Sequence, residues 1–188
     1  DPTRCRAAQA AGDPVRAWTD YAAAAEVMMI RHGDDDFLPP ARPGSFAAWM
    51  RDGRDGRYPT IDDFAYHLTT LFPPVRLKGW LELRMIDALP SPYWEAAAAV
   101  TYAALVDLPA ADVLAAVAGT ESAWADAAEH GLALPALAAA ARRLFTLAET
   151  AAPASFRDAV ADYAARFVNR GRCPADDRLD ARREPAWI

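Results

Sequence analysis

Apolar residues recur along the chain with two periods, which predict two kinds of element. Helical spacing is found in residues 14–25 and again in residues 60–72, where Thr60 and Asp63 form a capping-box start and Pro73-Pro74 ends the pattern. The run FAAWM, 46–50, follows a serine that can cap a helix. EVMMIRH, 26–32, and WLELRMI, 80–86, are short enough and apolar enough to predict strands.

Beyond residue 90 the pattern changes to one helix after another. The runs are rich in alanine and leucine, as helices that pack in a layer are, and no exact repeat is present. The helical runs are YWEAAAAVTYAALVD, ESAWADAAEH, a run that starts at Pro135, and PASFRDAVADYAARFVNRG.

Two strands among so many helices raise a structural problem, because an isolated strand pair is only marginally stable in water. Either the two strands pair with each other beneath the helices, or further sheet lies in a preceding part of the protein. The first residue is an aspartate rather than a methionine, which favours the second alternative and a fragment of a longer chain.

Composition excludes several classes of protein. A formal net charge of -6 and a pI near 5.0 argue against nucleic acid or a membrane surface as the partner, because both require a basic excess. No apolar run reaches the roughly 18 to 20 residues that a membrane span needs, and no targeting signal is recognisable, so the expected compartment is the cytoplasm. The two cysteines have neither zinc-site nor disulfide-framework spacing.

The segment VRLKGWLELRMIDA, 75–88, concentrates charge on a predicted strand. Alternation places Leu81, Leu83 and Met85 on one face, and Trp80, Glu82 and Arg84 on the other. The Cα atoms of Glu82 and Arg84 would lie roughly 6.5 to 7 Å apart, close enough to hold one ligand jointly.

Charge counts and residue chemistry support an anion site here. Residues 42–84 contain seven Lys or Arg against five Asp or Glu, a net charge of +2, which leaves -8 on the rest of the chain. A carboxylate suits Mg²⁺, and a guanidinium grips a carboxylate or phosphate. A solvated strand face with a cross-strand ion pair would show the same alternation, so the pattern leaves both interpretations open.

The segment HLTTLFPPVRLKGWLELRMIDA, 67–88, closely resembles glutamate–cysteine ligases of the plant-type and actinobacterial class, the latter serving ergothioneine biosynthesis. The resemblance covers the back half of that family, from about Trp18 to Asp180. It continues in order through DYAAAAEVMMIRH, GSFAAWM, PYWEAAAAVTYAALVD and RGRCPADDRLD.

This resemblance implies an α+β fold: the back half of a glutamine-synthetase-like antiparallel-sheet catalytic domain over residues 1–88, followed by a helical C-terminal region over residues 89–188. It implies that ATP phosphorylates the γ-carboxylate of L-glutamate and that the amine of L-cysteine attacks the acyl phosphate, with Mg²⁺ bridging the phosphates. The partner would be the missing N-terminal half of the same protein. Gly79 departs from the family pattern, in which an aromatic or basic residue is usual.

The resemblance also implies roles for individual residues. Glu82 would be a metal ligand, and Arg84 would face the transferring phosphoryl group or the substrate glutamate, with Arg76 facing phosphate. Further candidates for substrate or ATP binding are Lys78, Thr69, Thr70 and His67. For His67, a hydrogen bond from its helix to a neighbouring segment is the competing interpretation.

A second function class stays open beside the ligase. A non-catalytic helical interaction module derived from the same fold would bind a partner through its apolar helix faces. The charged pair Glu82 and Arg84 favours the ligase, since such a module has no use for it.

Residues 1–188 by themselves are predicted to expose strand edges and the apolar face of Leu81, Leu83 and Met85, and therefore to aggregate or to seek a partner. They should also be inactive, because Glu82 alone cannot complete the near-octahedral shell of Mg²⁺. Phosphate release with ATP, Mg²⁺, glutamate and cysteine should appear only after the upstream half is added. Turnover by the isolated chain would contradict the fragment interpretation.

Overall fold

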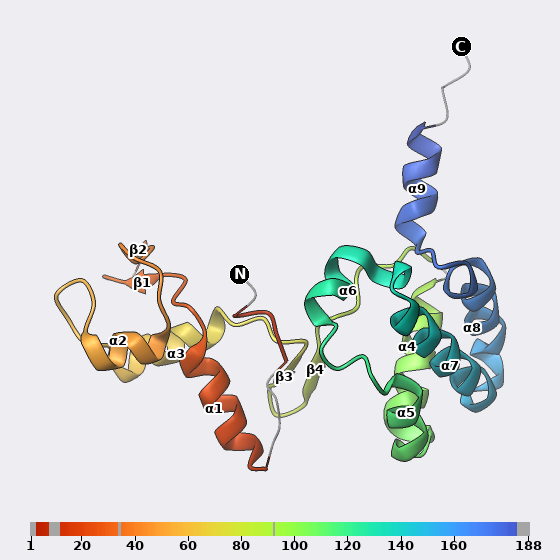
Figure 1. Cartoon of the computed structure of the whole chain (residues 1–188), viewed down its shortest axis with the longest axis horizontal. Helices are drawn as coiled ribbons and strands as arrows, with labels where there is room; N and C mark the ends of the chain where they lie inside the picture. Colours follow the sequence, from red (N-terminus) through yellow and green to blue (C-terminus); the bar gives the residue numbers. More distant parts are fainter. Residues whose placement is uncertain (1–2, 8–11, 34, 92, 184–188) are drawn as a thin grey trace. The chain divides into compact units, whose positions relative to one another are not determined.

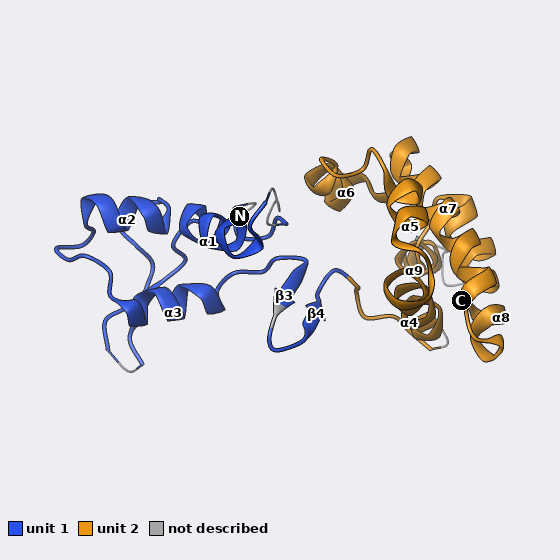
Figure 2. Ribbon diagram, turned by 90° about the horizontal axis from the view of Figure 1, so that it is seen from below, with its two compact units in different colours: residues 1–85 blue, residues 86–188 orange. Residues whose placement is uncertain are grey.

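The chain folds as two units, residues 1–85 and residues 86–188, which are coloured separately in Figure 2. The computed structural model describes residues 3–7, 12–33, 35–91 and 93–183. Helices predominate, and the described residues contain two small antiparallel sheets, so the fold class is α+β as predicted (Figure 1).

The first unit contains three helices and four short strands among its described residues. In chain order they are α1 (Pro14–Ala24), β1 (Ile30–Arg31), β2 (Phe37–Leu38), α2 (Phe46–Asp52), α3 (Ile61–Thr69), β3 (Val75–Leu77) and β4 (Leu81–Leu83). All three helix starts have a side-chain cap: Asp13 accepts from the amide of Val15, Ser45 from Ala48 and Thr60 from Asp63. The predicted capping box of Thr60 and Asp63 is confirmed.

The second unit contains helices and no strands among its described residues. Its elements are α4 (Tyr93–Tyr102), the π-helix η1 (Ala103–Asp107), α5 (Ala110–Val117), α6 (Trp124–His130), the 3₁₀-helix η2 (Gly131–Ala133), α7 (Pro135–Ala151), α8 (Ala154–Arg166), the 3₁₀-helix η3 (Val168–Arg170) and α9 (Pro174–Arg183). Pro135 occupies the first turn of α7, and Gly171 takes a left-handed conformation (φ 64°) after η3, as the sequence predicted.

The strands differ from the prediction in length and in pairing. β1 pairs with β2 and β3 with β4, so the expectation that 26–32 and 80–86 could pair with each other is wrong. Of the strand predicted over 26–32, only Ile30–Arg31 forms a strand. The amide of Val27 donates instead to the carbonyl of Gly44. The run 75–88 folds back on itself as a hairpin, since Gly79 adopts φ +79° in the loop between β3 and β4.

The core of the first unit lies among its three helices. Tyr21 and Ala22 of α1 pack with Leu71 in one cluster, and Phe46 and Trp49 of α2 form another with Val27 and Ile30. Phe64 of α3 touches both clusters, so one aromatic side chain joins the packing of the whole unit.

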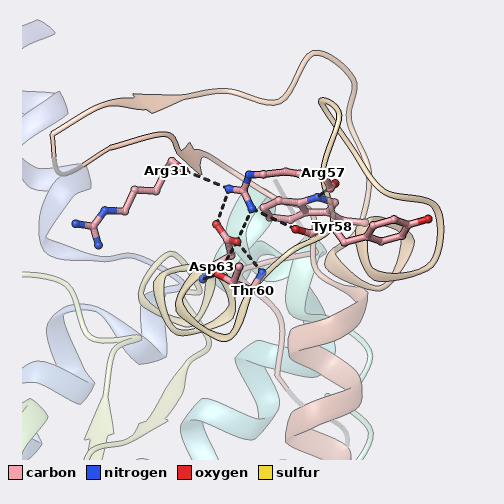
Figure 3. A network of polar contacts seen from close by, with 6 residues as sticks. Arg31, Arg57, Tyr58, Thr60 and Asp63 are labelled. Carbon is pink, nitrogen blue, oxygen red and sulfur yellow. Dashed lines mark hydrogen bonds and ion pairs between the residues drawn. The ribbon is translucent and has the colours of Figure 1, made fainter.

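An ion pair fixes the loop before α3, as Figure 3 shows. Arg57 makes two hydrogen bonds to the Asp63 carboxylate, at 2.6 and 2.8 Å, and donates a third to the carbonyl of Arg31 at 3.2 Å. The same carboxylate accepts from the amide and hydroxyl of Thr60. The guanidinium lies 4.9 Å from the Trp49 ring centroid. One buried carboxylate thus ties the loop, the helix start and β1 together.

The core of the second unit is built mainly from small side chains. Its buried cluster is Ala99, Val100, Ala103, Ala148, Ala152 and Val160. Aromatic rings of Tyr93, Phe145, Tyr163 and Phe167 pack beside one another on α4, α7, α8 and the turn after α8. Alanine allows helices to approach closely, which accounts for the alanine bias of the sequence.

No single described helix is long and apolar enough to cross a bilayer. Residues 124–133 and 135–151 reach that length and composition only when taken together, and the pair is bent by 77°.

We expect Asp63→Asn to lower the free energy of unfolding by about 2 kcal/mol at neutral pH, because a buried charge-assisted network loses its acceptor. Hydrogen bonding by Arg57 is the largest cause that lowers the pKa of Asp63 from 3.8 to about 2. This stabilisation is therefore present above pH 3.8 and is lost as the pH falls through about 2.

Urea denaturation at several pH values checks this expectation. The exposed neighbour Asp62, changed to Asn, is the matched control and should leave the unfolding midpoint nearly unchanged. Equal losses in both variants would show that the effect comes from charge at the helix start rather than from the network.

Candidate functional site

The hairpin of β3 and β4 brings four of the predicted site residues together. Its register pairs Val75 with Leu83, Arg76 with Glu82, and Leu77 with Leu81. The amide of Arg84 donates to the carbonyl of Pro74 at 2.8 Å, which extends the pairing by one residue. Because directly opposed residues share a face, this register places Arg76, Glu82 and Arg84 on one side of the hairpin.

Arg76 and Glu82 form a cross-strand ion pair. The Nε of Arg76 donates to a carboxylate oxygen of Glu82 at 2.6 Å. That hydrogen bond is the largest cause that holds the pKa of Glu82 below its ordinary value, and the charges of Arg76, Arg84 and Lys78 act in the same direction. The sequence left a cross-strand ion pair open as an alternative to joint ligand binding, and the structure contains one.

Arg84 lies apart from this ion pair although it shares the face. Its guanidinium carbon is 5.0 Å from the centroid of the Phe72 ring. Its Nη1 atom is buried and has no hydrogen-bond partner among the described residues. Joint binding of one ligand by Glu82 and Arg84 stays a prediction, and the contact between Arg84 and the Phe72 ring is one that the sequence pattern does not predict.

Lys78 stands in the hairpin loop, where its side chain is exposed and its amide donates to the carbonyl of Trp80 at 2.9 Å. Leu81 and Met85 are also exposed, at 60% and 47% of their surfaces. Leu83, the third residue of the predicted core face, is half-buried, so the exposure that the sequence predicts for this face is found at two of its three residues.

His67 lies in the core of the first unit and is 2% exposed. Its Nε2 is 2.9 Å from the carbonyl of Ala22, and a carbonyl only accepts, so Nε2 carries the hydrogen. Burial is the largest cause that lowers the pKa of His67. The ring lies against Phe46, with centroids 4.9 Å apart. His67 therefore links α3 to α1, and its predicted contact with substrate or ATP stays a prediction.

The two threonines at the end of α3 use their hydroxyls locally. Thr69 donates to the carbonyl of Tyr66 and Thr70 to that of His67, each at 2.7 Å. Thr69 is exposed and Thr70 buried. No hydrogen bond or ion pair between described residues joins His67, Thr69 or Thr70 to the charged hairpin, so their predicted ligand contacts are untested.

Mg²⁺ requires a near-octahedral shell of oxygen ligands. Glu82 supplies one carboxylate of the kind that Mg²⁺ prefers. No group of three His, Cys, Asp or Glu in the described part of the chain could hold a metal ion. Glu82 therefore fits as one ligand within a larger set and does not make a site by itself.

The chain is similar to known proteins along most of its length. The family model described as Glutamate-cysteine ligase family 2 matches residues 6–186. The chain is 41% identical over 184 residues to glutamate–cysteine ligase EgtA of Mycobacterium tuberculosis, covering 91% of the chain and 40% of that protein. Its identity to EgtA of Mycolicibacterium smegmatis is also 41%, over 173 residues, which cover 89% of the chain and 40% of the relative.

A plant relative matches over a shorter stretch. The chloroplastic glutamate–cysteine ligase of Solanum lycopersicum is 57% identical over 35 residues, or 19% of this chain and 7% of that protein. The chain thus spans about 40% of the length of the mycobacterial relatives it matches.

Removing the guanidinium in Arg76→Ala is expected to raise the pKa of Glu82 toward its ordinary value of 4.5, because the hydrogen bond that stabilises the carboxylate is lost. A carboxyl-carbon NMR titration of the chain measures this pKa directly. Lys78→Ala removes a charge on the same hairpin without removing that bond, so it should raise the pKa less. Equal rises in the two variants would mean that the net field, and not the ion pair, sets the protonation of Glu82.

Proposed function

Because the chain belongs to the glutamate–cysteine ligase family 2, we propose that it carries part of the active site of an ATP-dependent ligase. The reaction joins the γ-carboxylate of L-glutamate to the amine of L-cysteine. The observation that carries this proposal is the single hairpin face with Arg76, Glu82 and Arg84, and with Lys78 at its loop. The mycobacterial relatives are longer than this chain, so the whole activity is assigned to the longer protein.

In the proposed fold, the hairpin belongs to a glutamine-synthetase-like antiparallel sheet whose other strands lie in the rest of the protein. The exposed side chains of Leu81 and Met85 support this proposal, because a strand face with such residues gains from being covered. The shortness of both described sheets supports it as well, since two-stranded sheets have little stability of their own.

The proposed chemistry has two steps. First, a γ-carboxylate oxygen of glutamate attacks the terminal phosphorus of ATP, the bond from that phosphorus to the bridging oxygen breaks, and ADP leaves. The amine of cysteine then attacks the acyl carbon of γ-glutamyl phosphate; inorganic phosphate leaves, the nitrogen loses a proton, and an amide remains. Both steps move negative charge between oxygens, and positioned guanidinium groups stabilise such charge.

The residues of the hairpin have different parts in this proposal. Arg84 would bind the oxygens of the transferring phosphoryl group or of glutamate, because its Nη1 has no hydrogen-bond partner among the described residues. Arg76 would face phosphate once its bond to Glu82 is exchanged for a bond to the ligand. Glu82 would be one of the ligands of Mg²⁺, which when bound neutralises charge on the phosphates.

For the pathway, we propose ergothioneine biosynthesis. The resemblance to actinobacterial ligases supports this, and so does the identity to the two mycobacterial EgtA proteins along most of the chain. The cytoplasm is the compartment proposed for this reaction.

A non-catalytic interaction module remains the second candidate, because one observation favours it. Four large apolar side chains on α4, η1 and α5 are exposed by more than half of their surfaces: Tyr102, Leu105, Val106 and Leu114. Such side chains suit a protein partner as well as a covering segment of the same chain. The two candidates differ in whether the charged hairpin matters.

We expect two substitutions in the complete protein to abolish or greatly reduce turnover while leaving the fold intact. Glu82→Gln removes the charge of a metal ligand, and Arg84→Lys replaces a bidentate group by an ammonium that cannot make two parallel bonds. Formation of γ-glutamylcysteine from ATP, glutamate and cysteine measures the effect, and Asp62→Asn, at an exposed residue outside the hairpin, is the control that should keep the wild-type rate. Wild-type rates in both Glu82 and Arg84 variants would refute the catalytic role of the hairpin and favour the module.

A further inference from the structure

The guanidinium of Arg84 is held in place while its hydrogen-bonding capacity is left unused. Its carbon lies 5.0 Å from the centroid of the Phe72 ring, within the range of a cation–π contact. Nη1 is buried and has no hydrogen-bond partner among the described residues. A buried charged donor without an acceptor is costly in a native protein, so an unfilled binding position is a physical explanation for it.

The second arginine of this hairpin face provides the contrast. Arg76 donates to Glu82 at 2.6 Å, so much of its charge is already offset by a carboxylate. Within the described residues, no ion pair offsets the charge of Arg84 in the same way. The hairpin face therefore presents Arg76, which is in an ion pair, and Arg84, which contacts an aromatic ring and has an unpaired Nη1 among the described residues.

The fold fixes the ring and the guanidinium relative to each other. The amide of Phe72 donates to the carbonyl of Arg4 at 2.8 Å, and the two prolines that follow are buried. Proline restricts φ, so the chain from Phe72 to Pro74 has little freedom. The amide of Arg84 donates to the carbonyl of Pro74, which holds Arg84 beside the segment that begins at Phe72.

We propose that Phe72 is a positioning residue that holds Arg84 edge-on for an oxyanion, either a phosphate group or a substrate carboxylate. The inference rests on the proposed function, which makes the hairpin part of a ligase site. The ring contact restrains the guanidinium carbon over Phe72, and Nη1 has no partner among the described residues. A carboxylate or phosphate in the guanidinium plane then receives two parallel hydrogen bonds from a group that has already lost its freedom.

The burial of Nη1 has a second consequence. An ionic hydrogen bond is stronger where water is excluded, as it is around this atom. Phe72 thus contributes to oxyanion affinity without touching the ligand. An aliphatic side chain of similar size would fill the space but would lack the electron-rich face that attracts the cation.

The test compares Phe72→Leu with Phe72→Trp, which restores an aromatic face. Phe72 is 44% exposed, so a larger ring has room and the fold should tolerate both changes. Trp80→Leu is the matched control, because Trp80 is an exposed aromatic of the same hairpin (69%) whose ring has no described contact with an arginine. Thermal unfolding midpoints verify that each variant is folded.

The first readout requires no turnover. Inorganic phosphate and, separately, L-glutamate are titrated into the complete protein while the Nε–H resonance of Arg84 is followed by NMR. We expect Phe72→Leu to weaken binding of the responding oxyanion about three- to thirty-fold, the range of a stacking contact that is partly shielded from water. Phe72→Trp should stay within about two-fold of wild type, and Trp80→Leu should have no effect.

The second readout separates the two sources of the oxyanion. A KM for ATP that rises in Phe72→Leu with an unchanged KM for glutamate identifies phosphate as the group at Arg84, and the reverse identifies the substrate carboxylate. Either result supports the inference.

Three outcomes would overturn the inference: Phe72→Leu binding as wild type does, Phe72→Trp losing as much as Phe72→Leu, or Arg84 failing to respond to either anion. A different result would contradict the proposed ligase reaction and leave this inference intact. Oxyanion binding that depends on Phe72, in a wild-type protein that forms no γ-glutamylcysteine, would refute the proposed reaction and support the positioning role.

Discussion

The backbone register of the hairpin is the constraint on which the candidate site depends. Gly79 supplies the left-handed φ that lets the chain reverse, and the bond from the amide of Arg84 to the carbonyl of Pro74 carries the pairing to the base of the hairpin. A shift of the register by one residue would send Arg76 and Glu82 to opposite faces, because side chains alternate along a strand. Every proposal made for the charged face follows from this pairing.

The rest of the first unit holds the base of that hairpin in place. His67 joins α3 to α1 through the carbonyl of Ala22, and Leu71, just before the hairpin, is fully buried beside Tyr21. At the other end of α3, the Asp63 carboxylate accepts hydrogen bonds from Thr60 and from Arg57 in the preceding loop. The helix between these two anchors is fixed at both ends, so the segment that follows it starts from a defined position. Rigid support of this kind is what precise placement of a functional group requires.

Features set by neighbouring residues could be predicted from the sequence, and features that depend on distant contacts could not. The capping box of Thr60 and Asp63 is a local pattern and was found, as was the helix that starts at Pro14. Charge alternation predicts that Glu82 and Arg84 share a face, but the strand pattern does not show where the chain turns, so the opposition of Arg76 and Glu82 is only an alternative at the level of sequence. The ion pair of Arg57 with Asp63 and the burial of His67 depend on how α1, α2 and α3 pack. Phe72 was assigned to an apolar helical pattern, and only the tertiary structure places its ring against Arg84.

The central claim is that the hairpin face receives an oxyanion of the ligase reaction at Arg84. A crystal structure of the complete protein with a non-hydrolysable ATP analogue, Mg²⁺ and L-glutamate tests it most directly. We predict a phosphate or carboxylate oxygen within hydrogen-bond distance of the Arg84 guanidinium, with the Phe72 ring stacked beneath it and a carboxylate oxygen of Glu82 on the metal. Ligands bound elsewhere, with Arg76 still paired to Glu82 and the edge of Arg84 facing only solvent, would contradict the account.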